Sequence, residues 1–132
     1  MATNEDGDGL AGVLRRTIVE LVRRDGHDLS ARQFSVFLIC YLENDAQTVR
    51  GLAEALDISK PAISRALDRL AEFELVKRKT DPADRRSVLV QRTQQGSAFI
   101  REIKSILRMA AANPEAPAAK PRAARGAARA AR

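Results

Sequence analysis

The chain has 132 residues, 45% of them hydrophobic, which is enough for one modest core and argues against a second domain. Lys and Arg number 23 against 17 Asp and Glu, and the net charge of +6 favours a polyanionic partner such as nucleic acid, although many basic proteins bind none. No apolar run is long enough to span a membrane and the first residues lack the features of a secretory signal, so we expect a cytoplasmic protein. Cys40 and His27 are the only residues of their types, so we expect no disulfide, no metal and no cofactor.

The apolar pattern predicts two helices in the first third of the chain. Residues 1–9, rich in Gly, Asp and Asn, are expected to be disordered. Apolar residues then recur at three- and four-residue steps from Leu10 to Val22, which predicts an amphipathic helix that ends before Gly26. Ser30 is a suitable N-cap for a second helix, whose apolar stripe is broad enough to be buried on most sides.

The next segment predicts two short helices joined by a tight turn. Thr48 caps the first, over residues 49–56, and Ser59 caps the second, which ends near Phe73 and has Pro61 early, where a missing N–H costs nothing. Such a pair is typical of a helix-turn-helix, whose second helix enters the DNA major groove, although two simply packed helices would show the same spacing. The outer face of the second helix carries small hydroxyls and charged groups that suit phosphates and base edges: Ser59, Lys60, Ser64, Arg65, Asp68 and Arg69.

A basic hairpin follows the helix pair. Residues 75–79 and 87–91 are predicted to form two short strands around a polar tip at 80–86. Its cations would repel one another without an anionic partner, and an arginine on a protruding loop can enter a narrow minor groove; a solvated basic turn is the alternative. We expect Asp84 to hold one arginine of the tip by a charge-assisted hydrogen bond and to leave the other to reach DNA. The cations of the hairpin are Lys77, Arg78, Lys79, Arg85 and Arg86.

These elements predict a mainly α fold with a small β-hairpin wing, a winged helix-turn-helix. Thr93 caps a last helix that runs to about Ala112, so the domain with its flanking helices covers residues 10–112. Residues 113–132 are almost entirely Ala, Pro, Arg and Lys and are expected to be a disordered basic tail. This tail either binds DNA phosphates without sequence preference or is a solubilising segment. Its basic residues are Lys120, Arg122, Arg125, Arg129 and Arg132.

Several motifs follow one another along the winged region. They are the segment from Val49 to Leu70, Leu75-Val76, Asp81-Pro82-Ala83-Asp84-Arg85-Arg86 and Thr93-Gln94-Gln95-Gly96. With them the chain resembles the MarR family over about residues 29–97. In that family the recognition helix enters the major groove, an arginine wing reaches the minor groove, and a homodimer docks on a pseudopalindrome. The resemblance implies DNA contacts by Ser59, Lys60, Pro61, Ser64, Arg65 and Arg69 and by the wing residues Asp84, Arg85 and Arg86. To these we add the cap Thr48 and the wing cations Arg78 and Lys79.

Three features depart from the pattern of the family. Glu74 stands where a glycine usually ends the recognition helix, so a left-handed cap there would cost about 1 kcal/mol, or the helix ends differently. Arg92 replaces an apolar residue and is expected to add a cation near the wing. The last helix is shorter than the dimerisation helices of the family, which marks a short member with a basic tail. MarR-like proteins often bind small phenolic effectors, but no residue here marks a pocket for one.

We predict a sequence-specific regulator of transcription that binds double-stranded DNA on the nucleoid and acts as a repressor by occluding polymerase. We also predict a homodimer that forms through the apolar stripes of residues 10–24 and 94–112. Both stripes could instead pack onto the domain. The alternatives in function are an architectural nucleoid- or plasmid-associated protein of low specificity, and a protein-binding winged helix, which the exposed cations argue against. No catalytic set can be assembled, so an enzyme is not predicted. Cys40 is expected to be buried and unreactive, and His27 to be exposed.

Overall fold

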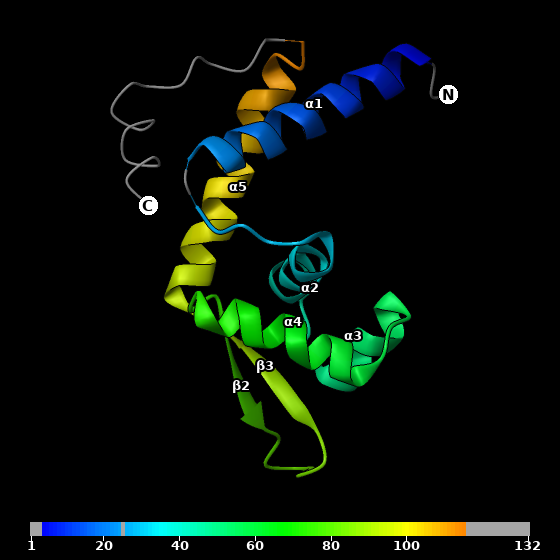
Figure 1. Cartoon of the computed structure of the whole chain (residues 1–132), viewed down its shortest axis with the longest axis vertical. Helices are drawn as coiled ribbons and strands as arrows, with labels where there is room; N and C mark the ends of the chain where they lie inside the picture. Colours follow the sequence, from blue (N-terminus) through cyan, green and yellow to red (C-terminus); the bar gives the residue numbers. More distant parts are fainter. Residues whose placement is uncertain (1–3, 25, 116–132) are drawn as a thin grey trace. The chain divides into compact units, whose positions relative to one another are not determined.

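The computed structural model describes residues 4–24 and 26–115 and divides into two compact units. The winged unit comprises residues 29–101, and the helical unit comprises the described residues up to 28 and from 102 onward. The predicted mainly α fold with a small wing is confirmed. The elements in chain order (Figure 1) are α1 (Asn4–Arg23), α2 (Ala31–Leu42), β1 (Gln47–Thr48), α3 (Val49–Leu56), α4 (Lys60–Glu72), β2 (Val76–Thr80), β3 (Val88–Arg92) and α5 (Gln94–Ala112).

The three strands of the winged unit form one antiparallel sheet in the order β1-β3-β2. The hairpin of β2 and β3 is paired from Val76 opposite Arg92 to Thr80 opposite Val88. The short strand β1, with Thr48 opposite Leu89, joins the start of α3 to the sheet. Sequence reasoning missed β1 because two residues are too few to show the alternation that marks a strand.

The core of the winged unit is built from the inner faces of α2, α3 and α4. Ile63, Leu67 and Leu70 of α4 are all 0% exposed, as the apolar spacing predicts. Phe37 of α2 is also fully buried, and its ring lies 5.2 Å from that of Phe99, centroid to centroid. Full burial of such side chains contributes about 1.5–3 kcal/mol each, so this packing fixes which face of α4 is left for solvent.

Tyr41, near the end of α2, joins both ends of the hairpin. Its buried hydroxyl donates to the carbonyl of Leu75, at 2.6 Å, and accepts the backbone N–H of Thr93, at 2.9 Å. Leu75 precedes β2 and Thr93 follows β3, so one side chain holds the chain where it enters and leaves the wing. A Cβ on Gly96 would lie 1.7 Å from the Tyr41 oxygen, so only glycine fits there.

The predicted helix caps are present. Ser30 forms a full capping box with Gln33, Thr48 accepts the N–H of Gly51, and Ser59 accepts the N–H of Ala62. These bonds satisfy amide groups that the first turn of each helix leaves without a partner.

The recognition helix α4 ends in a left-handed residue that is not glycine. Glu74 has φ of 60°, the N–H of Leu75 bonds the carbonyl of Leu70 at 2.9 Å, and the N–H of Glu74 bonds that of Ala71 at 2.9 Å. This pair of bonds is the Schellman arrangement, in which a non-glycine residue pays a steric cost of about 1 kcal/mol. The helix therefore ends as it would with glycine, and the strain stays in the fold.

The helical unit corrects two expectations. The prediction that residues 1–9 are disordered is wrong for residues 4–9, because α1 begins at Asn4. The two glycines of this stretch weaken a helix, but Asp8 lies near the helix N-terminus, whose partial positive charge attracts a carboxylate. His27 is half-buried rather than exposed, and burial lowers its pKa below the ordinary value, although Glu102 acts in the opposite direction.

Within the helical unit, an ion pair from Arg24, just after α1, and a hydrogen bond from α1 reach α5 and the residue that follows it. Arg24 pairs with Glu20 at 3.1 Å and with Glu102 at 3.4 Å, and Arg16 donates to the carbonyl of Asn113 at 2.8 Å. None of the described helices combines the length and apolar character that a membrane span requires.

Replacing Glu74 with glycine should stabilise the chain. We expect Glu74→Gly to raise the free energy of unfolding by up to about 1 kcal/mol, because glycine removes the steric cost of a positive φ. Urea denaturation measures the change. Glu74→Ala is the matched control, since it also removes the side chain but keeps the strain. Equal stability of the two variants would show that the left-handed turn carries no such cost.

Candidate nucleic-acid interface

The outer face of α4 is polar and cationic, while its inner face is buried. Lys60, Pro61 and Arg65 are exposed and Ser64 is half-buried, as expected for a helix that presents this side to a ligand. In the described part of the chain, Lys60 and Arg65 have no ion-pair partner. Arg69 is also exposed, but it pairs with Glu72 at 2.9 Å and its guanidinium lies 4.6 Å from the centroid of the Phe73 ring. Among these described residues, the helix thus offers Lys60 at its start and Arg65 near its middle without ion-pair partners, and Arg69 near its end with one.

Thr48 and Ser59 both use their side chains as helix caps. Thr48 Oγ1 accepts the N–H of Gly51 at 2.9 Å, and Ser59 Oγ accepts the N–H of Ala62 at 3.2 Å. Each hydroxyl keeps its own proton available for donation, which suits a phosphate oxygen.

The tip of the wing is shaped by two aspartates. Asp81 Oδ1 accepts the N–H of Ala83 at 2.9 Å, and Asp84 Oδ1 accepts the N–H of Arg86 at 3.0 Å. The backbone closes the loop with a bond from the N–H of Asp81 to the carbonyl of Ser87 at 2.9 Å. Both carboxylates therefore act on backbone N–H groups, as aspartates do in tight turns.

The predicted bond from Asp84 to an arginine side chain is wrong. The carboxylate is engaged by the backbone N–H of Arg86 and by the hydroxyl of Ser87, at 3.4 Å, and not by a guanidinium. A local turn satisfies the carboxylate at a lower entropic cost than a long side chain would, because the backbone is already ordered. Within residues 26–115, the side chains of Arg85 and Arg86 are exposed and make no ion pair, so the tip carries two available cations.

Arg78 of β2 forms an ion pair with Asp68 of α4. The pair joins the recognition helix to the strand that leads to the tip, and the exposed fractions of the two side chains are 35% and 56%. Sequence reasoning assigned Arg78 to DNA and missed this partner, since the two residues are ten positions apart and lie on different elements. Lys79, the neighbouring predicted contact, is exposed.

Arg92 lies away from the place predicted for it. Instead of adding a cation to the wing, it donates to the carbonyls of Cys40, at 2.9 Å, and Glu43, at 2.7 Å, at the end of α2. A cation at a helix C-terminus is favoured by the partial negative charge there, which is the physical reason for the difference. Burial raises the pKa of the Cys40 thiol to about 11, against the opposing effect of Arg92, which agrees with the buried, unreactive cysteine predicted from the sequence.

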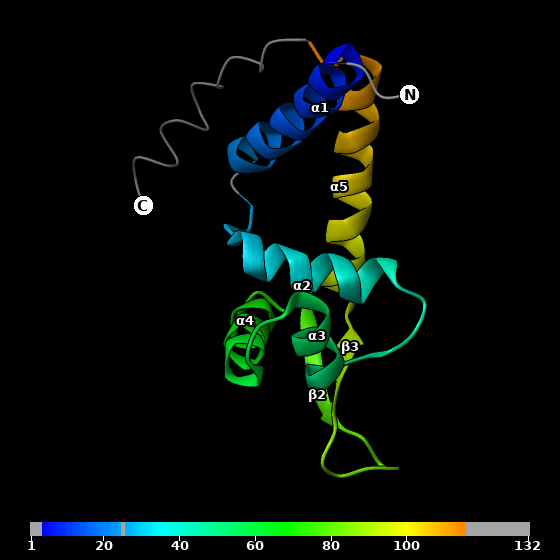
Figure 2. The ribbon, with the colours of Figure 1, turned by 90° about the vertical axis from the view of Figure 1, so that its right-hand side faces the viewer.

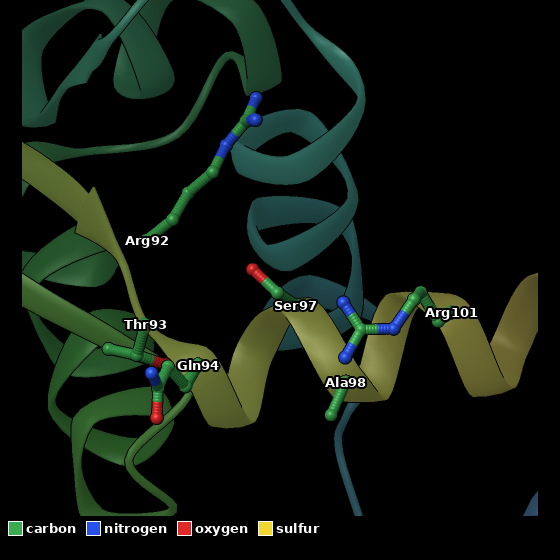
Figure 3. A pocket seen from close by; sticks show the side chains of 6 residues that line it. All are labelled: Arg92, Thr93, Gln94, Ser97, Ala98 and Arg101. Carbon is green, nitrogen blue, oxygen red and sulfur yellow. The ribbon is translucent and has the colours of Figure 1, made fainter.

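An open hollow of about 690 Å³ lies beside the start of α5 and is lined by Arg92, Thr93, Gln94, Ser97, Ala98 and Arg101 (Figure 3). The two arginines point in different directions: Arg92 extends toward α2, while Arg101 lies along α5 over Ala98. They do not converge on one point in the hollow. The predicted tail contacts, Lys120, Arg122, Arg125, Arg129 and Arg132, lie outside the described residues.

Comparison with known proteins identifies the winged unit. Residues 29–88 match the family model described as MarR family. This match lies within the winged unit and covers less than half of the chain. The chain is 29% identical over 77 residues to the HTH-type transcriptional regulator MhqR of Bacillus subtilis, and the match covers 58% of this chain and 52% of MhqR. The chain therefore spans about half the length of this curated relative.

Solved structures of MarR-family proteins have the same fold. The crystal structure of MarR aligns with a TM-score of 0.58 and 29% identity, and the alignment covers 76% of this chain and 73% of that one. The structure of the S. aureus MepR-DNA complex aligns with a TM-score of 0.64 and 22% identity, covering 76% of this chain and 80% of that one. At 22% identity the second likeness shows the fold alone.

The Asp68–Arg78 pair should contribute measurably to the stability of the winged unit. In a double-mutant cycle with Asp68→Asn and Arg78→Gln, we expect a coupling energy of about 0.2–1 kcal/mol, the range of exposed pairs, and a decrease on adding salt. Urea denaturation of the two single variants and the double variant measures it. The pair of Arg50 and Glu54, at 3.6 Å and 78% and 73% exposed, is the matched control and should couple less. Additive effects at Asp68 and Arg78 would refute the link between helix and wing.

Proposed function

We propose that this chain is a sequence-specific transcriptional regulator that binds double-stranded DNA, with α4 in the major groove and the wing in the minor groove. The observation that carries the proposal is the distribution of unpaired cations. Within the described part of the winged unit, Lys60 and Arg65 on α4 and Arg85 and Arg86 at the wing tip are exposed without ion-pair partners. A duplex backbone neutralises such groups at both places at once.

The residues of α4 take different parts in this proposal. Arg65 projects from the second turn, where a recognition helix reaches base edges, and Ser64 and Pro61 flank it. Lys60 and the caps Ser59 and Thr48 bind phosphates that set the register of the helix on the duplex. Arg69, held by Glu72 and stacked on Phe73, binds a phosphate farther along the groove.

The wing supplies the second contact. Asp84 fixes the turn and leaves the guanidiniums of Arg85 and Arg86 to enter a narrow minor groove, where the negative potential is strongest. Lys79 and Arg78 face the adjacent backbone, Arg78 as part of its pair with Asp68. The DNA complex of MepR, a protein with this fold, and the regulator MhqR support the same function here.

We further propose a homodimer that acts as a repressor by occluding polymerase. An apolar stripe runs along α1 at steps of four residues, and its exposed fractions are large: Leu10 71%, Leu14 62%, Ile18 43% and Val22 57%. An exposed stripe of this length is unfavourable in water and favours a second copy of the chain as its cover. A symmetric dimer would place two copies of α4 about 34 Å apart, one turn of DNA.

Selection of bound fragments from genomic DNA tests the DNA-binding proposal. We expect the wild type to prefer its site by about 10³-fold or more over bulk DNA. Arg65→Ala should lower that preference by about 1–3 kcal/mol and relax it at one base position, because an arginine fork reads guanine. Arg101→Ala, which removes an equal charge from an exposed site on α5, is the control. A wild-type preference near unity would favour the architectural alternative instead.

Sedimentation of the free protein tests the dimer. We expect the wild type to sediment as a dimer at micromolar concentration and Leu14→Glu to sediment as a monomer, because the variant places a charge in the middle of the apolar stripe. Gln91→Glu adds the same charge at an exposed position of β3 and should leave the dimer intact. A monomeric wild type would contradict the proposal.

A further inference from the structure

A second cationic hollow lies between the start of α2 and the middle of α4, and of its lining residues only Arg65 belongs to the contacts proposed above. Its volume is about 230 Å³, and it is lined by Ser30, Arg32, Gln33, Ala62, Arg65 and Ala66. The two views of the winged unit agree in placing α2 directly against α4 (Figure 2). Arg65 thus has a neighbour on another element that sequence reasoning did not consider.

The residues that line this hollow carry positive charge and no negative charge. Arg32 and Arg65 are its only charged residues, both are exposed, and across residues 4–24 and 26–115 neither has an ion-pair partner. Two guanidiniums that share a small hollow repel each other unless an anion lies between them. The lining holds no carboxylate that could take that place.

The remaining polar groups of the hollow are already bonded. Ser30 Oγ accepts the N–H of Gln33 at 3.1 Å, and Gln33 Oε1 accepts the N–H of Ser30 at 3.0 Å. The capping box therefore closes the start of α2, and the charged donors of the hollow are the two guanidiniums, beside the hydroxyl of Ser30 and the amide of Gln33. Guanidinium groups bind tetrahedral oxyanions through paired N–H donors, so phosphate is the ligand that this pair fits.

We propose that Arg32 and Arg65 together bind one phosphate of the DNA backbone at the edge of the helix-turn-helix, which extends the interface from α4 onto α2. The inference rests on the proposed function, because the phosphate belongs to the duplex that α4 reads. Arg65 has five N–H donors, so one edge of its guanidinium binds this phosphate while another remains for a base. Arg32 contacts no base and adds affinity without sequence preference.

Salt titration of DNA binding tests the proposal. The probe is a duplex recovered by the wild type from genomic DNA, with a scrambled duplex of equal length beside it, and Kd is measured between about 50 and 200 mM salt. For Arg32→Ala we expect the slope of log Kd against log salt to fall by about 0.9, one phosphate contact, and equal weakening on both duplexes. Arg101→Ala, an exposed arginine outside the hollow, should keep the wild-type slope. Thermal melts confirm that both variants fold.

A double-mutant cycle with Arg65→Ala sharpens the test. Because both arginines bind one phosphate, the double variant should lose less affinity than the sum of the two single losses. Strict additivity, or an Arg32→Ala slope equal to that of Arg101→Ala, overturns the proposal. If the slope is unchanged and inorganic phosphate at constant ionic strength raises the melting temperature of the wild type alone, the hollow binds free phosphate and the DNA contact is overturned. A wild type without preference for its selected duplex refutes the proposed function itself, which is a separate result.

Discussion

The hydroxyl group of Tyr41 is the contact on which the geometry of the winged unit depends. It bonds the chain just before β2 and just after β3, so the hairpin leaves the body of the unit from a fixed base. The cost of moving this base is high, because the buried carbonyl of Leu75 and the part-buried N–H of Thr93 would lose their partner together, at about 1–3 kcal/mol for a buried group. Gly96 completes the arrangement, since any side chain there would occupy the position of the hydroxyl.

Two further contacts extend this control outward along the wing. Arg78 of β2 is joined to Asp68 on α4, and the tip is closed by turns at Asp81 and Asp84. The wing is therefore held at its base, along one strand and at its end. Such a hairpin presents its arginines at a defined height above α4, and a preorganised contact of this kind loses little conformational entropy on binding.

Local features of this fold could be predicted from the sequence, and features that need a distant partner could not. The caps at Ser30, Thr48 and Ser59 each depend on a residue three positions away, so the local sequence identifies them. The roles of Arg78 and Arg92 depend on partners on other elements, Asp68 in one case and the carbonyls that end α2 in the other. The hollow between α2 and α4 could not be predicted either, because its lining residues lie on two elements. Charge alone marks a residue as cationic, but it does not tell whether the fold has already supplied an anion.

The carboxylates of the interface explain how an acidic group can remain on a surface that attracts a polyanion. Asp68 is balanced by Arg78, while Asp81 and Asp84 accept backbone N–H groups that would otherwise bind water. Each carboxylate thus helps to hold the position of the wing or the conformation of its tip. In the described winged unit, the unpaired guanidiniums proposed to bind DNA lie at two separate places, Arg32 and Arg65 at the hollow between α2 and α4, and Arg85 and Arg86 at the tip. Two separated clusters suit a ligand with negative charge along two neighbouring grooves, and they suit a flat anionic surface less well.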